Sequence, residues 1–113
     1  MEQQSKETKQ ENKKLTSKQL QHLRGLGHHL KPIVMLGREG VSDNVISAAN
    51  AVLAAHELIK VKIGNGCLLE RREAADVLAE STGSQVVQIL GKTLLLYRAN
   101  SELDKEKRIN LPR

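Results

Sequence analysis

Aromatic side chains are almost absent from this 113-residue sequence, which has one Tyr, no Phe and no Trp. Modules that read single-stranded nucleic acid by base stacking need aromatic platforms. A chain whose one aromatic residue is Tyr97 cannot build such a platform. If it binds nucleic acid, we therefore expect contacts with the backbone and the overall shape rather than stacking on exposed bases.

Cysteine is also scarce, and Cys67 is the only one. A lone cysteine forms no intramolecular disulfide, and together with scattered histidines it offers no zinc-ligand spacing. No apolar run approaches the roughly 20 residues that span a bilayer, and the N-terminal residues lack the apolar centre of a signal peptide. These absences predict a cytoplasmic protein without disulfide, metal, cofactor or membrane anchor.

Acidic residues are missing from one long stretch. The net charge of the chain is +5 and its pI is about 9.6. Between Asn12 and Arg38 there is no Asp or Glu, whereas the rest of the chain mixes both signs. The basic and histidine side chains of this stretch are Lys13, Lys14, Lys18, His22, Arg24, His28, His29, Lys31 and Arg38. Such a concentrated excess favours a nucleic-acid partner, with an anionic membrane surface second.

A first helix is predicted to begin after a cap at Thr16 or Ser17 and to reach about His29. Residues 1–14 before it, rich in Gln, Lys and Glu, are expected to form a disordered tail. The leucines of the helix recur every three or four residues in one apolar stripe: Leu20, Leu23, Leu26 and Leu30. At about 100° per residue, a different face carries Lys14, Lys18, His22, Gly25 and His29. That face is either a solvated surface or a binding surface, and the helix alone leaves both open.

The next segments predict a strand, a helix and a second strand. Residues 33–36 are all apolar, as expected of a strand covered on both faces. Ser42 or Asp43 can cap the helix that follows. The second strand has alternating faces, one apolar and one lysine-bearing, formed by Ile59, Val61 and Ile63 and by Lys60 and Lys62.

A third helix and a hairpin complete the order. The helix covers about 69–82, turns Ala74, Val77 and Leu78 inward, and ends at Gly83. Strands at 86–90 and 93–97 are joined by Gly91-Lys92, which fits a tight turn. Residues 99–113 are expected to be loosely held. The order α-β-α-β-α-β-β predicts an α/β fold, a small four-stranded mixed sheet with helices packed on it in two or three layers.

The first strand runs into Gly37-Arg38-Glu39-Gly40, directly before a helix. The pair of glycines is typical of an ordinary turn, but it also fits a loop that lets a phosphate approach the backbone. Arg38 could then add a charge-assisted contact. A nucleotide site is disfavoured, because the Gly-Lys-Ser/Thr ending of a P-loop and the third glycine of GxGxxG are missing. A GxxG clamp on a nucleic-acid backbone remains, as in KH modules, although KH loops join two helices.

Four stretches of the chain carry a family resemblance: LTSKQLQHLRGLGHHLKPIVMLGREGVSDNVI, HELIKVKI, GKTLLLYR and INLPR. Together they span residues 15–98 and part of the last segment, and they resemble the CRM family (chloroplast RNA splicing and ribosome maturation) in its stand-alone, bacterial YhbY-like form. The resemblance implies one RNA-binding domain at 15–98, between the polar tail 1–14 and a charged C-terminal tail at 99–113. It also implies a fold similar to the C-terminal domain of translation initiation factor three, with an added N-terminal helix.

The resemblance further implies RNA binding through the GxxG loop and the adjacent basic surface. The partners would be ribosomal RNA and precursors of the large ribosomal subunit, bound by a monomer with no small-molecule substrate. Carried onto this sequence, the RNA-binding residues are Lys18, His22, Arg24, His29, Lys31, Gly37, Arg38, Glu39 and Gly40. The acid Glu39 is unexpected beside RNA, and we expect its side chain to point away or to pair with Arg38 or Lys31.

Two other functions compete with RNA binding. In the first, the basic face docks an acidic protein partner, and RNA binding is incidental. In the second, the protein is a small hydrolase or nuclease. The acids of the third helix recur at helical spacing, which favours a solvated face over a catalytic pair: Glu70, Glu73, Asp76 and Glu80. We therefore expect a protein that is not an enzyme.

Overall fold

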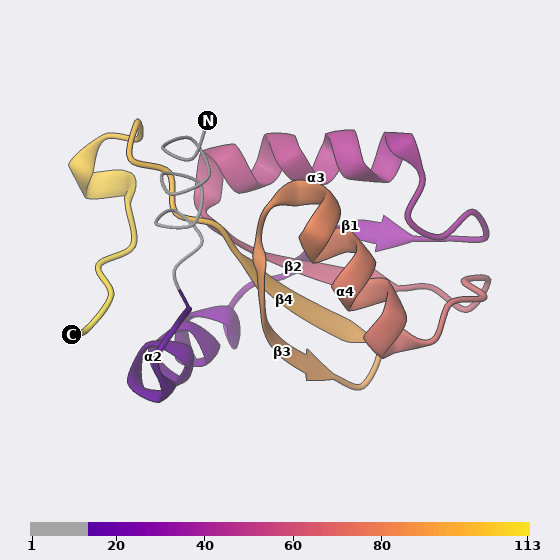
Figure 1. The fold of residues 1–113 in the computed structure, drawn as a ribbon, viewed down its shortest axis with the longest axis horizontal. Coiled ribbons are helices and arrows are strands. Elements are labelled where there is room, and N and C mark those ends of the chain that lie inside the picture. The colour runs from indigo at the N-terminus through magenta and orange to yellow at the C-terminus, as the bar shows by residue number, and fades with distance from the viewer. Residues whose placement is uncertain (1–13) are drawn as a thin grey trace, which may run out of the picture.

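A computed structural model describes residues 14–113 of the chain. The predicted disordered tail at 1–14 lies outside this range except for Lys14. The elements in chain order are α2 (Ser17–Gly27), β1 (Pro32–Leu36), α3 (Asp43–His56), β2 (Leu58–Ile63), α4 (Arg71–Thr82), β3 (Gln85–Leu90), β4 (Thr93–Tyr97) and the short 3-10 helix η1 (Lys105–Lys107) (Figure 1). This is the predicted order of helices and strands.

The four strands form one mixed sheet in the order β1-β2-β4-β3. β1 pairs with β2 in parallel, whereas β4 pairs antiparallel with both β2 and β3. The α/β class and the mixed four-stranded sheet are therefore confirmed. The implied similarity to the C-terminal domain of translation initiation factor three stays a prediction.

Helices cover the two faces of the sheet unequally (Figure 1). α3 and α4 pack on one face, where alternate residues of β2 and β4 such as Val61 and Leu96 join Leu53 and Leu78 in the main core. α2 packs on the opposite face through Leu23, in a smaller cluster of Leu58, Val87, Leu95 and Tyr97. Because α2 lies over only one end of the strands, the rest of this second face is open (Figure 1).

Local sequence signals place the helix ends where expected. Thr16 caps α2 in a capping box, in which its hydroxyl accepts from the Gln19 backbone and the Gln19 side chain accepts from the Thr16 backbone. Ser42 caps α3, and Gly83 ends α4 in the left-handed conformation. The hairpin turn at Gly91-Lys92 is also confirmed, with Gly91 at φ +59°.

Burial differs from the prediction in three places. β1 is an edge strand and is not covered on both faces, since Ile33 and Met35 are 51% and 61% exposed while Leu36 is fully buried. The predicted apolar stripe of the first helix is incomplete, because Leu26 is 40% exposed and Leu30, 36% exposed, lies beyond the end of α2. On α4, Ala75 rather than Val77 faces the core, and Val77 is exposed.

The segment after β4 is packed, so the expectation that it is loosely held is wrong. Ile109 and Leu111 contact the small cluster under α2. The carboxylate of Glu57, fully buried at the end of α3, accepts backbone hydrogen bonds from Asn100 (2.7 Å) and Ile109 (2.6 Å) and pairs with Arg108 at 3.5 Å. These contacts hold the segment against the corner between α3 and β2.

Candidate nucleic-acid interface

The glycine loop is a tight turn at the end of β1. The Gly40 amide donates to the Gly37 carbonyl at 3.0 Å, which leaves Arg38 and Glu39 exposed at the tip. Gly37 has open space around the position of an added Cβ. Gly40 is buried at φ +64°, and an added Cβ would lie 3.1 Å from Leu69 Cδ1. The two glycines thus differ: Gly37 gives access to the backbone, and Gly40 gives the turn its shape.

A second glycine turn lies beside the first. The Gly64 amide donates to the Leu36 carbonyl at 2.8 Å, and an added Cβ on Gly66 would lie 3.8 Å from the backbone nitrogen of Arg38. The side chain of Lys92, from the β3–β4 hairpin, donates to Asn65 Oδ1 at 2.9 Å. The loops that follow β1 and β2 therefore meet at one end of the sheet, the right-hand end in Figure 1.

Glu39 does not form either predicted ion pair. Within residues 14–113 the ion pairs are Arg72–Asp76 and Arg108–Glu57, and Glu39 contacts neither Arg38 nor Lys31 in this way. Its side chain is exposed at the loop tip. The alternative expectation, that it points into solvent, fits this exposure.

The basic residues of α2 lie on two flanks of the helix. Lys18 and His22 are exposed and four residues apart, so they share one outward side of α2, and His29 is exposed in the turn that follows the helix. Arg24, also exposed, lies on the flank that borders the open face of the sheet. Lys31 is exposed in the connection between α2 and β1.

The predicted site residues are not gathered in one cluster. α2 and the glycine loop lie near opposite ends of β1 (Figure 1). A strand of five residues spans on the order of 15 Å. The arrangement is therefore an extended surface, which suits a long polyanion better than a small molecule.

Two lysines that the sequence analysis did not count as site residues lie between the two ends. Lys60 and Lys62 belong to the face of β2 opposite the main core, and Lys62 is paired in register with Met35, two residues before Gly37. In the sequence, these lysines alternate with Ile59, Val61 and Ile63. This alternation correctly predicts a strand with one open face, but it does not predict where that face lies relative to the glycine loop.

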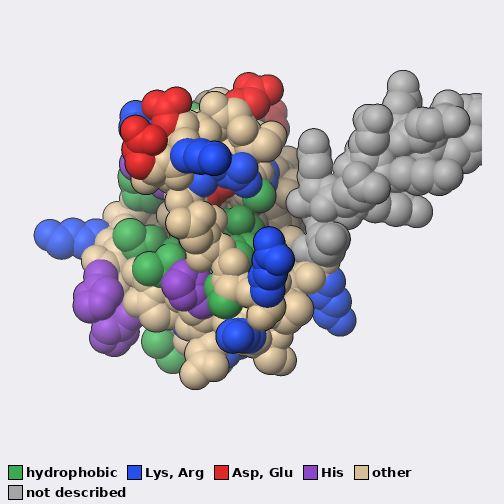
Figure 2. Space-filling view, turned by 90° about the vertical axis from the view of Figure 1, so that its left-hand side faces the viewer, with side chains coloured by type: hydrophobic (Ala, Val, Ile, Leu, Met, Phe, Trp, Pro, Cys, Tyr) green, Lys and Arg blue, Asp and Glu red, His purple; other side chains and the backbone are tan. Residues whose placement is uncertain are grey.

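Positive charge on this surface is not neutralised within the described chain. None of the basic side chains of residues 18–38 takes part in an ion pair among residues 14–113. The exposed acids of α4 lie on the opposite face of the sheet, and Glu73, Asp76 and Glu80 all point to solvent as predicted. Figure 2 views the molecule from the left-hand side of Figure 1, and there Lys and Arg side chains occur both in the lower part of the view and beside the acidic side chains at its top.

Other chemistry has little support in the described residues. In this part of the chain no three His, Cys, Asp or Glu side chains gather as a metal site would require. Nor does any helix within 14–113 have the length and apolar composition needed to cross a bilayer. The pKa of Tyr97 is raised by burial and then by the charge of Glu57. Tyr97 belongs to the packing of the C-terminal segment and lies away from the glycine loop.

Comparison with known proteins identifies relatives over nearly the whole described chain. Residues 15–98 match the model of the CRS1 / YhbY (CRM) domain. The chain is 41% identical over 98 residues to the probable RNA-binding protein YqeI of Bacillus subtilis, covering 87% of this chain and 99% of that protein. It is 38% identical over 99 residues to a Haemophilus influenzae protein named RNA-binding protein, covering 88% of this chain and 96% of that one.

A solved structure extends the likeness to the fold. The solution structure of the hypothetical protein SAV1595 from Staphylococcus aureus superimposes with a TM-score of 0.73 at 37% identity, and covers 88% of this chain and all of that one. The resemblance inferred from the sequence motifs is thereby confirmed. The chain belongs to the CRS1/YhbY (CRM) domain family.

Proposed function

We propose that this protein binds structured RNA through the sugar–phosphate backbone. The binding surface would be a basic face made of three parts: the glycine loop Gly37–Gly40, the open face of β2 with Lys60 and Lys62, and the exposed cations of α2 and its C-terminal connection. The observation that carries the proposal is the continuity of unpaired cations from α2 to a loop whose backbone is accessible at Gly37. Two relatives that carry RNA binding in their names support it.

The loop would contribute backbone amides and one guanidinium. Because nothing occupies the space beside Gly37, a phosphate oxygen can approach the chain there without meeting a side chain. Arg38 offers a forked donor at the tip, which matches a phosphate. The start of α3 adds the partial positive charge of a helix N-terminus, although the Ser42 hydroxyl already accepts from the Val45 amide.

The lysines and α2 would extend the contact along the RNA. Phosphates repeat along a duplex, so a row of cations on one side of the protein can neutralise several of them at once. Such contacts fix position and carry little sequence information. We propose precursors of the large ribosomal subunit as the RNA, in keeping with the family resemblance, and no catalytic step.

The experiment measures RNA affinity against salt for the full chain and three variants. Lys62→Ala and Gly37→Asp should each weaken binding, and Lys62→Ala should lower the slope of log K against log salt by about 0.7 to 0.9. Arg72→Ala is the matched control, because Arg72 is an exposed cation on α4, on the opposite side of the sheet. If Arg72→Ala weakens binding as much as Lys62→Ala, the proposed face is wrong.

A protein partner is the second candidate, favoured by one specific feature. The exposed apolar side chains Leu26, Leu30 and Ile33 line one surface cavity together with Lys31, near the start of β1. Contiguous apolar surface with a basic rim is typical of docking sites for acidic, partly apolar segments. Leu30→Ser with Ile33→Ser should abolish such an interaction and leave RNA affinity unchanged, which separates the two functions.

A further inference from the structure

A cavity opens between the last turns of α2 and the uncovered part of the sheet. Its volume is about 360 Å³, and it is lined by residues of α2, β2, β3 and β4. The helix comes close to the sheet here because Gly27 has no side chain: an added Cβ would lie 2.5 Å from Leu95 Cδ2. Gly25 also borders the cavity, but it lies two residues before Gly27, about 200° around the helix, so an added side chain there would point away from the sheet into open space. Gly27 therefore sets the distance between the helix and the cavity's sheet side.

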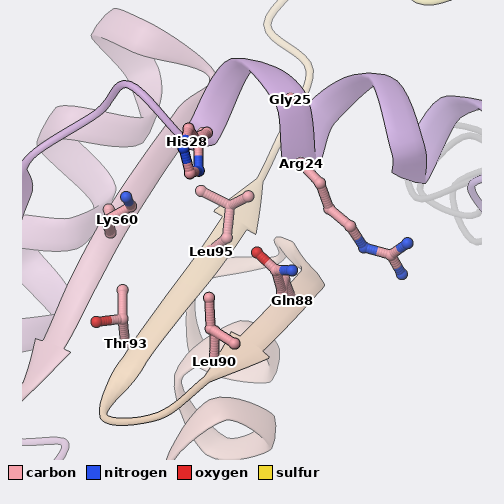
Figure 3. Close-up of a pocket in the computed structure, with 9 residues that line it drawn as sticks. Arg24, Gly25, His28, Lys60, Gln88, Leu90, Thr93 and Leu95 are labelled. Carbon is pink, nitrogen blue, oxygen red and sulfur yellow. The ribbon is translucent and has the colours of Figure 1, made fainter.

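The lining has three kinds of surface (Figure 3). Leu90 and Leu95 form an apolar floor on the sheet. Gln88 and Thr93 add a carboxamide and a hydroxyl, and neither side chain hydrogen-bonds to any group within residues 14–113. At the margin, the basic side chains of Arg24 and Lys60 border the cavity, while Arg24 extends outward from the helix in Figure 3.

The imidazole of His28 is a flat surface on the helix side of the cavity. It extends from the end of α2 toward Leu95 and Lys60 (Figure 3). The ring meets the His29 ring edge to face, with centroids 5.6 Å apart and planes at 82°, which restrains its orientation. Histidine is one of the side chains on which RNA-binding proteins stack unpaired bases. The scarcity of Tyr, Phe and Trp therefore does not exclude stacking, because this histidine can also take part in it.

These surfaces together match a flat heterocycle attached to an anion. Its faces would lie between the imidazole and the leucines, its edge would meet the free carboxamide and hydroxyl, and its phosphate would meet the cations at the margin. The volume lies near the lower end of the range for ligand pockets, which is about 300–1,000 Å³, so it suits one ring system rather than several stacked ones.

We propose that this cavity receives the base of a single unpaired RNA nucleotide, stacked on His28 and recognised at its edge by Gln88 and Thr93. The inference rests on the proposed RNA-binding function and deepens it. Backbone contacts along the basic face would provide affinity for structured RNA. The cavity would direct the protein to places where that structure contains a bulged or looped-out nucleotide.

The test compares two RNA hairpins that differ by one bulged nucleotide, bound by the full chain and three variants. The natural chain should bind the bulged hairpin about tenfold more tightly than the fully paired one. His28→Ala should remove this preference by removing the stacking surface and should keep the affinity for the paired hairpin. The substitution is accommodated by the fold, since His28 is exposed at the end of α2.

His56→Ala is the matched control. His56 is exposed at the end of α3 and does not line the cavity, so this variant should retain the preference. Gln88→Leu should change which of the four bulged bases is preferred, because it removes the edge contact and keeps the floor.

The outcomes separate the two proposals. Equal binding of both hairpins by the natural chain would overturn the cavity assignment and leave backbone binding intact, whereas binding of neither would overturn the proposed function itself. A loss of affinity for both hairpins in His28→Ala would also overturn the assignment. Calorimetry with the four nucleoside monophosphates separates the sources of the base: tight binding of a free nucleotide, without preference for the bulge, would make this a small-molecule site.

Discussion

Gly37 and Gly40 are both glycines of one loop, but Gly37 gives access to the backbone and Gly40 determines the conformation of the turn. Gly40 adopts φ +64° and faces Leu69, so an alanine there is strained in the backbone and crowded by a core side chain. Gly37 has neither constraint. A spacing of two glycines cannot reveal this difference, because it depends on Leu69, which lies almost thirty residues further along the chain.

Substitution should therefore separate folding from binding within the loop. Gly40→Ala should lower the free energy of unfolding by about 1–2 kcal/mol and lower Tm by several degrees, whereas Gly37→Ala should leave Tm unchanged. Thermal unfolding followed by circular dichroism measures both. Equal losses of Tm in the two variants would contradict the assignment of the turn to Gly40.

Tyr97 links a single residue to the pH dependence of stability. Burial and the Glu57 carboxylate raise the pKa of Tyr97 in the folded chain above its ordinary value of about 10. A raised pKa means that the folded state holds the proton more tightly than the unfolded state. The stabilisation is complete below pH 10 and is lost as the pH rises from there through the folded pKa.

The corresponding variant is Tyr97→Phe. It keeps the buried ring and removes the ionisable group, so the decline in the free energy of unfolding above pH 10 should become shallower. Urea unfolding at pH 8 and at pH 10.5 measures the difference. An unchanged pH dependence in the variant would show that other groups, such as lysines, cause the decline.

At the scale of elements, the strands show what a sequence can and cannot predict. The helix ends were predictable because a cap such as Thr16 or Ser42 acts on amides within three residues of itself. The apolar run at 33–36 was assigned correctly to a strand but wrongly to the covered interior. Whether a strand is covered depends on which elements pack over it, and α2 stops before it covers β1.

Neighbouring residues of β1 should consequently respond very differently to truncation. Leu36→Ala removes a fully buried side chain and should cost about 2–5 kcal/mol of unfolding free energy. Met35→Ala removes a side chain that is 61% exposed and should cost less than about 0.5 kcal/mol. Denaturant unfolding of the two variants is the measurement, and a large loss in Met35→Ala would mean that the open sheet face is covered in solution.

The candidate site shows the same division between local and distant information. The acid-free stretch and the glycine loop could be found by inspection, since their residues are adjacent in the sequence. Inspection could not reveal that Lys60 and Lys62 lie between the glycine loop and α2, nor that a cavity lies beside His28. Both features depend on the strand order β1-β2-β4-β3, which only the fold shows. The structural role of Glu57 was likewise not predicted from the sequence, although its buried carboxylate anchors the C-terminal segment.

At the scale of the whole molecule, the proposed RNA-binding face extends from the glycine loop across β2 to α2. The described chain measures 39 × 36 × 25 Å along its principal axes. The glycine loop and α2 lie near opposite ends of β1, and neither Arg38 nor Lys18 takes part in an ion pair within the described chain. Sites separated in this way usually contribute additively to a free energy. Their joint engagement, however, requires one RNA long enough to reach both.

Additivity should therefore depend on the length of the RNA. On a long ribosomal fragment, Arg38→Ala and Lys18→Ala should each lower the salt slope by about 0.7 to 0.9, and the double variant should lower it by the sum. On fragments shortened until they reach only one end, one of the two substitutions should lose its effect. Fluorescence anisotropy over a series of fragment lengths and salt concentrations measures this, with Arg72→Ala as the unaffected reference. If both substitutions keep their full effect on the shortest fragment that binds, the two ends act on the same phosphates and the extended footprint is wrong.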